Sequence, residues 1–112
     1  MTESSLTSES RWIYSEIGDD PELRDLIQLF VDEMPARIST FEDLLKEQEW
    51  DELRRSAHQL KGAAGSYGFA AVTAAAAAVE QAIRQELPFE EVRQRLDELI
   101  DLCQRARVSR ED

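Results

Sequence analysis

Apolar residues recur at helical spacing along almost the whole chain, and this periodicity constrains its fold more than any other feature. Four stripes stand out: Leu23/Ile27/Phe30/Met34/Ile38/Phe41/Leu45, Leu53/Ala57/Leu60/Ala64/Tyr67, Val72/Ala76/Val79/Ile83 and Phe89/Val92/Leu96/Leu99/Cys103. Each stripe gives a helix one apolar face. The 112 residues include only 4 Gly and 3 Pro, which leaves little room for loops. The sequence therefore predicts one all-α domain, most simply an antiparallel up-down four-helix bundle with short connections.

Proline, glycine and aspartate mark the predicted helix boundaries. The segment Asp20-Pro21-Glu22 provides an N-cap, a first-turn proline and an acidic first turn for the first helix. Pro35 lies inside that helix, so we expect a kink or a brief break just before it. Asp51 is the predicted N-cap of the second helix, which Gly68 ends, and Pro88 opens the fourth.

The two ends of the chain are expected to differ from the bundle. Trp12, Ile13 and Ile17 predict a short helical arm laid over the bundle. The chain would then divide into a flexible tail, the bundle and a frayed C-terminus, at residues 1–9, 10–107 and 108–112. Because it starts at a methionine and ends near the last helix, we expect a free-standing protein.

Charge and composition narrow the function classes. A formal net charge of -11 opposes binding to nucleic acid, since the phosphate backbone would be repelled, and it favours a protein partner. Residues 62–79 are uncharged but rich in Ala and interrupted by Gly, which argues against a membrane span. No secretory signal is evident, and Cys103 has no intramolecular disulfide partner, so it is expected to be a small buried residue. We therefore expect a cytoplasmic monomer.

The single histidine of the chain, His58, lies beside glycines that disfavour a helix. At about 100° per residue, His58, Gly62 and Gly65 fall on the side of the helix opposite the Leu53/Leu60 stripe. This side is expected to face water. Each interior glycine costs about 0.5–1 kcal/mol relative to alanine. This cost suggests a surface kept flat for close approach. In addition, residues 54–79 contain no acidic residue, so an anion near His58 would meet little repulsion.

These residues resemble the signature of a known family. The segment Ala57-His58-Gln59-Leu60-Lys61-Gly62, followed by Gly65 and Gly68, is similar to the motif of histidine-phosphotransfer (HPt) domains. Further similar segments are Asp20-Pro21-Glu22-Leu23, Phe30-Val31, Met34-Pro35-Ala36-Arg37, Trp50 and Val79-Glu80, so the resemblance covers about residues 13 to 104. It implies a four-helix bundle that carries a phosphoryl group between receiver (response-regulator) domains, including those of a hybrid histidine kinase.

The resemblance also implies roles for individual residues. A neutral imidazole, with a reference pKa of about 6.5, is a competent nucleophile at cellular pH, so His58 is the expected phosphoacceptor rather than a surface bystander. Lys61 would give electrostatic support to the phosphoryl group. Glu80 would orient the imidazole, although a solvated acid is an equal alternative. Residues expected to contact the partner are Arg54, Arg55, Gln59, Gly62, Gly65 and Tyr67.

Other classes of function fit less well. A metal or haem site needs several convergent ligands, and one histidine does not supply them, so we expect no metal and no cofactor of the chain's own. No Gly-rich phosphate loop is present, which argues against a kinase or any enzyme with its own turnover. Mg²⁺ is expected to come with the receiver. The alternative that remains is a helical binding module that inhibits a receiver or kinase without phosphotransfer.

Overall fold

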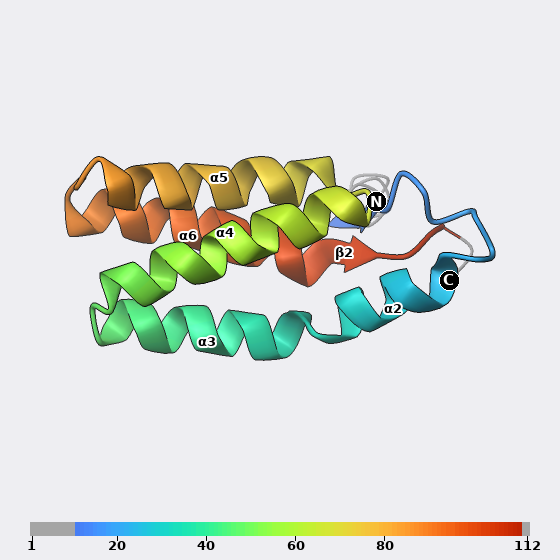
Figure 1. Cartoon of the computed structure of the whole chain (residues 1–112), viewed down its shortest axis with the longest axis horizontal. Coiled ribbons are helices and arrows are strands. Elements are labelled where there is room, and N and C mark those ends of the chain that lie inside the picture. Colours follow the sequence, from blue (N-terminus) through green and yellow to red (C-terminus); the bar gives the residue numbers. More distant parts are fainter. Residues whose placement is uncertain (1–10, 111–112) are drawn as a thin grey trace, which may run out of the picture.

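A computed structural model describes residues 11–110, within which five helices and one pair of short strands follow one another (Figure 1). In chain order they are β1 (Ile13–Tyr14), α2 (Arg24–Asp32), α3 (Met34–Lys46), α4 (Trp50–Ser66), α5 (Ala70–Arg84), α6 (Phe89–Arg105) and β2 (Ala106–Arg107). The prediction of a mainly helical chain is confirmed. The predicted tail at residues 1–9 lies outside the described residues.

The core is built from most residues of the predicted apolar stripes, whereas Phe89, expected on the buried side of the fourth helix, is 36% exposed. Ile27, Leu53, Leu60, Val79 and Leu96 have no exposed surface. Helices α4, α5 and α6 lie side by side, and α3 packs along α4 and α6 (Figure 1). The predicted burial of the lone cysteine is also confirmed, because Cys103 is 2% exposed and burial raises the pKa of its thiol to about 12.

The predicted break before Pro35 separates α2 from α3. Glu33 ends α2 and precedes α3, and Pro35 lies in the first turn of α3, where its missing N–H leaves no hydrogen bond unmade. The predicted start of the first helix was three residues too early. Asp20 instead accepts a hydrogen bond from the Glu22 N–H at 2.9 Å within a turn, and the helix begins at Arg24.

Three helices end with the same reversal of the chain. After α4, Gly68 has a φ of +83°, and the Phe69 N–H donates to the Ala64 carbonyl at 2.9 Å. Gln48 and Glu86, each with a φ of 56°, have the equivalent positions after α3 and α5. This left-handed closure satisfies carbonyls of the last helical turn and keeps the connections short. The end of the second helix at Gly68 is thus confirmed, whereas its start is Trp50 rather than the residue after Asp51.

The predicted N-terminal helical arm is wrong. Residues 13–14 form β1, which pairs in parallel with β2 through Ile13 opposite Ala106 and Tyr14 opposite Arg107. The Ser15 N–H extends the pairing by donating to the Arg107 carbonyl at 3.2 Å. So short a segment nucleates a helix poorly, and the chain that leaves α6 offers it hydrogen-bond partners instead.

The expectation that the chain frays from residue 108 is also wrong at its first two positions. Val108 and Ser109 are 2% and 5% exposed. The segment around Gly18 covers them so closely that a Cβ at Gly18 would overlap the Val108 carbonyl. The ordered chain therefore continues beyond the predicted boundary at residue 107, because β1 and the turn after it hold this end in place.

Candidate functional site

His58 lies on the outer side of α4, as predicted. Its neighbours on the inner side, Ala57 and Leu60, are fully buried, which fixes the rotation of the helix about its axis. The His58 side chain is 60% exposed. The imidazole can therefore be reached from solvent while its helix is anchored by the core.

Glu80 of α5 lies beneath this imidazole and is 5% exposed. Its Oε2 is 2.9 Å from Nδ1 of His58, and its Oε1 is 2.8 Å from Nζ of Lys61. The Arg84 guanidinium donates to the same Oε2 at 3.1 Å. The solvated-acid alternative for Glu80 is therefore wrong, because this carboxylate is buried and shared among three basic side chains.

Lys61 and His58 keep the Glu80 carboxylate ionised. The hydrogen bond from Lys61, aided by the hydrogen bond from His58 and the charges of both, lowers the pKa of Glu80 from its ordinary value of 4.5, against the opposing effect of burial. An ionised carboxylate can only accept hydrogen bonds. We therefore assign the proton of the neutral imidazole to Nδ1, which leaves the lone pair on Nε2.

The surface beside His58 has free space at Gly62 and nearly as much at Gly65. A Cβ at Gly62 would meet nothing within 4 Å, and a Cβ at Gly65 would only touch Thr73 Oγ1 at 3.6 Å. Neither glycine is required by packing within this chain. Gly68 differs, because a Cβ there would lie 2.8 Å from Ser15 Oγ in addition to its strained φ.

The remaining predicted contact residues are spread more widely. Arg55 is paired with Glu52 at 2.6 Å on the exposed side of α4. Gln59 lines a hollow between α3 and α4, and Arg54 lines another with Trp50 and residues of the α5–α6 turn. Tyr67 packs against the Phe30 ring at 5.2 Å. The structure thus joins His58, Lys61 and Glu80 in one cluster but does not bring Gln59 or Tyr67 into it.

Arg84 is the member of the cluster that the sequence analysis missed. It lies four residues after Glu80 on α5, and such a spacing places two side chains next to each other on a helix. The spacing alone could have identified the pair. Its connection to His58 could not be seen from sequence, since it depends on how α4 and α5 pack.

The described part of the chain holds neither a metal cluster nor a membrane-spanning helix. Among residues 11–110, no three His, Cys, Asp or Glu side chains gather as a metal ion would require. Within the same range, no helix has the length and apolar composition needed to cross a bilayer.

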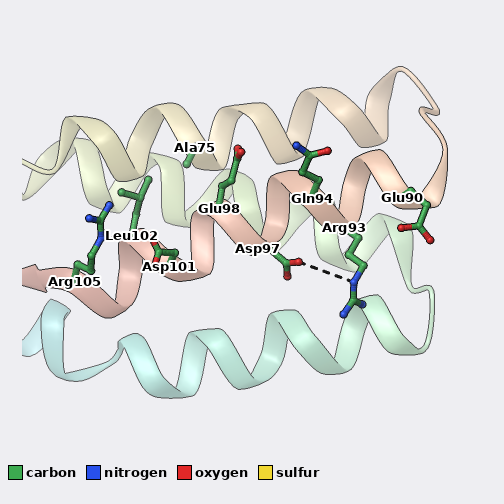
Figure 2. A pocket seen from close by; sticks show the side chains of 9 residues that line it. All are labelled: Ala75, Glu90, Arg93, Gln94, Asp97, Glu98, Asp101, Leu102 and Arg105. Carbon is green, nitrogen blue, oxygen red and sulfur yellow. Dashed lines mark ion pairs between the residues drawn. The ribbon is translucent and has the colours of Figure 1, made fainter. Parts of the chain in front are cut away.

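A hollow along the outer face of α6 contains none of the predicted site residues (Figure 2). It is lined by Ala75, Glu90, Arg93, Gln94, Asp97, Glu98, Asp101, Leu102 and Arg105. Its ion pairs, Arg93 with Asp97 at 4.0 Å and Arg105 with Asp101 at 3.4 Å, each lie within the one helix. No second element contributes a charged group to it.

The fold and the site together define a helical protein with one exposed imidazole held by a buried carboxylate, an arrangement suited to carrying a transferable group. The family model described as the Hpt domain matches residues 25–109, which is most of the chain, and the chain belongs to this family. Hpt domains carry a phosphoryl group on histidine in phosphorelays and interact with response-regulator receiver domains. No curated protein and no solved structure gave a significant match. The matched region includes the buried Val108 and Ser109.

Proposed function

We propose that this protein is a phosphorelay carrier in which Nε2 of His58 accepts a phosphoryl group from the aspartyl phosphate of a receiver domain. It then passes the group to a second receiver aspartate, or back to the first. The observation that carries the proposal is the 2.9 Å contact between Nδ1 of His58 and the buried Glu80, since it leaves Nε2 as the reactive nitrogen on an exposed face. The chain is an intermediate in the relay rather than an enzyme with its own turnover.

The geometry supports a simple transfer step. The lone pair on Nε2 forms the N–P bond while the bond from phosphorus to the aspartyl oxygen breaks, and its electron pair leaves with the aspartate carboxylate. Positive charge develops on the ring, which retains its proton on Nδ1. Glu80 is already ionised and fixed beside that proton, so it stabilises this charge without reorganisation.

Lys61 supplies the charge that the phosphoryl oxygens need. Its Nζ is held by Oε1 of Glu80, and its side chain is 33% exposed, one helical turn from His58. Lys61 can therefore exchange the carboxylate oxygen for a phosphoryl oxygen when the N–P bond forms. The receiver is expected to bring the Mg²⁺ that neutralises the remaining charge during transfer.

We expect the receiver to dock over the open glycines. Gly62 and Gly65 admit close approach of a partner to His58, and no acidic residue of the sequence between 54 and 79 opposes the phosphoryl group. The tight reversals at Gln48, Gly68 and Glu86 support the antiparallel up-down order of the helices that such a carrier needs. The free, buried thiol of the chain accords with a monomer acting in the cytoplasm.

Intact mass spectrometry tests the proposal against an inhibitory binding module. The wild type, His58→Gln and the double variant His58→Gln/Gln94→His are each mixed with a panel of phosphorylated receiver domains and Mg²⁺. The double variant places an exposed histidine on the outer face of α6, away from Glu80. We expect an acid-labile phosphoryl gain in the wild type alone. Receiver binding without any such gain would favour the inhibitory module instead.

A further inference from the structure

One oxygen of Glu80 serves two donors. Oε2 lies 2.9 Å from Nδ1 of His58 and 3.1 Å from a terminal nitrogen of Arg84, whereas Lys61 occupies Oε1. Arg84 comes from the next turn of α5, and its side chain is 58% exposed. The carboxylate that faces the imidazole is therefore partly neutralised on the same oxygen by a second cation.

This sharing opposes the effect of Glu80 on the ring. Positive charge develops on the His58 ring when the N–P bond forms, and a free carboxylate would stabilise that charge fully. A guanidinium on the same oxygen withdraws part of the negative charge and adds a positive charge nearby. Phosphorylated His58 would then be less stable than beside Glu80 alone, and the group would leave more readily toward an aspartate.

We propose that Arg84 is a positioning residue that limits how strongly Glu80 polarises His58, and that it thereby sets how the phosphoryl group is shared between His58 and a receiver aspartate. The inference rests on the proposed carrier function and adds a residue that controls its equilibrium. Lys61 is less suited to this task, because it is the cation placed to move to the phosphoryl oxygens. Arg84 instead binds Oε2, the oxygen that faces Nδ1.

No other charged side chain of α4 or α5 is placed to neutralise Oε2 of Glu80. On α4, Arg55 is engaged by Glu52 at 2.6 Å, and Arg54 lines the hollow beside Trp50 that Arg84 also lines. On α5, residues 70–84 carry no charged side chain other than Glu80 and Arg84. Among the described residues, Arg84 is thus the cation that contacts the oxygen that binds Nδ1.

The test compares Arg84→Gln with Arg84→Lys, which keeps the charge, and with Arg93→Gln as a matched control from an exposed pair on α6. Each variant is equilibrated with one phosphorylated receiver domain and Mg²⁺, and the fraction of phosphoryl group on His58 is measured. We expect the ratio of phospho-His58 to phospho-aspartate to rise about two- to fivefold in Arg84→Gln, the range of coupling found for partly exposed ion pairs. Arg84→Lys and Arg93→Gln should stay close to the wild type.

A second readout needs no phosphoryl donor. The chain has one histidine, so its ¹⁵N spectrum holds a single set of ring nitrogens, and we expect the Nδ1 resonance to move downfield in Arg84→Gln as its hydrogen bond to Glu80 strengthens. In a Glu80→Gln background the same substitution should move neither the resonance nor the ratio. An unchanged resonance in Arg84→Gln, or an effect that survives Glu80→Gln, would overturn the role of Arg84. A failure of receiver transfer with the resonance shifted would instead count against the carrier function.

Discussion

The His58 face of α4 and α5 and the outer face of α6 carry the same kinds of charged residue in different settings. On the His58 face, Glu80 is 5% exposed and binds groups from two helices. On the outer face of α6, Arg93 and Asp97 are 54% and 63% exposed and belong to one helix (Figure 2). Only the first arrangement depends on the packing of the bundle.

The difference makes the hollow on α6 a weaker candidate for a reactive site than the His58 face. Ion pairs between exposed side chains contribute about 0–1 kcal/mol and are screened by salt, so the hollow on α6 holds no group in a fixed state. A buried carboxylate with three partners is fixed in both position and charge. Chemical function is therefore expected where burial and charge coincide.

Gly62→Gln, on the His58 face, is expected to change phosphoryl transfer more than any other substitution discussed below. Nothing lies within 4 Å of a Cβ at this position, so the helix tolerates the change, but a docked receiver would meet the added side chain. We expect phosphoryl transfer to fall about 5- to 150-fold, which corresponds to an overpacking cost of about 1–3 kcal/mol at the interface. Transfer rates from a phosphorylated receiver provide the measurement, with circular dichroism to verify helicity.

Asp97→Gln is the matched control, because it places the same side chain on the outer face of α6. Its transfer rate should equal that of the wild type. Loss of transfer in Asp97→Gln as well, or normal transfer in Gly62→Gln, would remove the functional distinction between the faces.

Glu80→Gln tests whether the buried Glu80 carboxylate contributes more to the free energy of unfolding than the exposed carboxylates on the outer face of α6. The folded-state pKa of Glu80 is depressed, chiefly by Lys61, so its contribution is present above the unfolded value near 4.5 and is lost as pH falls through the folded value. We expect Glu80→Gln to cost about 1.5–3 kcal/mol at neutral pH, as for hydrogen bonds to charged groups. The cost should shrink as the solution is acidified below pH 4.5.

Urea unfolding at a series of pH values measures this dependence, and Glu98→Gln on the outer face of α6 is the control. Glu98 is exposed, so its variant should follow the wild-type curve. Equal costs for the two substitutions at neutral pH would show that burial does not distinguish Glu80.

The sequence predicted the parts of the fold that depend on local patterns. The four apolar stripes, the break before Pro35 and the reversal at Gly68 follow from periodicity, a missing N–H and a left-handed φ that glycine adopts at low cost. The same reversal occurs at Gln48 and Glu86, where no glycine marks it. There the packing of the flanking helices imposes a conformation that the residue type does not favour.

Contacts between distant segments were beyond the reach of pattern analysis. Pairing of Ile13 with Ala106 depends on where α6 ends, and no alternation of apolar residues in two-residue strands could reveal it. At the site, exposure of His58 was predictable from its place on α4. The burial of Glu80 and the sharing of its oxygen with Arg84 were not, because both require the relative rotation of α4 and α5.

Gly65→Ala has the smallest expected effect. It tests whether a glycine on the His58 face lowers the stability of the fold while leaving room for a docked receiver. A Cβ at Gly65 would make an ordinary contact with Thr73 Oγ1 at 3.6 Å, and the helical φ of this position suits alanine. We expect the free energy of unfolding to rise by about 0.5–1 kcal/mol, since alanine loses less backbone entropy on folding. Thermal unfolding measures the gain.

Gln94→Ala on the outer face of α6 provides the comparison, because it replaces one good helix former by another and should change the stability by less than about 0.5 kcal/mol. If Gly65→Ala raises the stability, the fold does not require a glycine at this position. If Gly65→Ala is instead neutral or destabilising, the packing of α4 against α5 requires this glycine. The open surface at Gly62 would then be the sole clearance beside His58, and docking would depend on that one position.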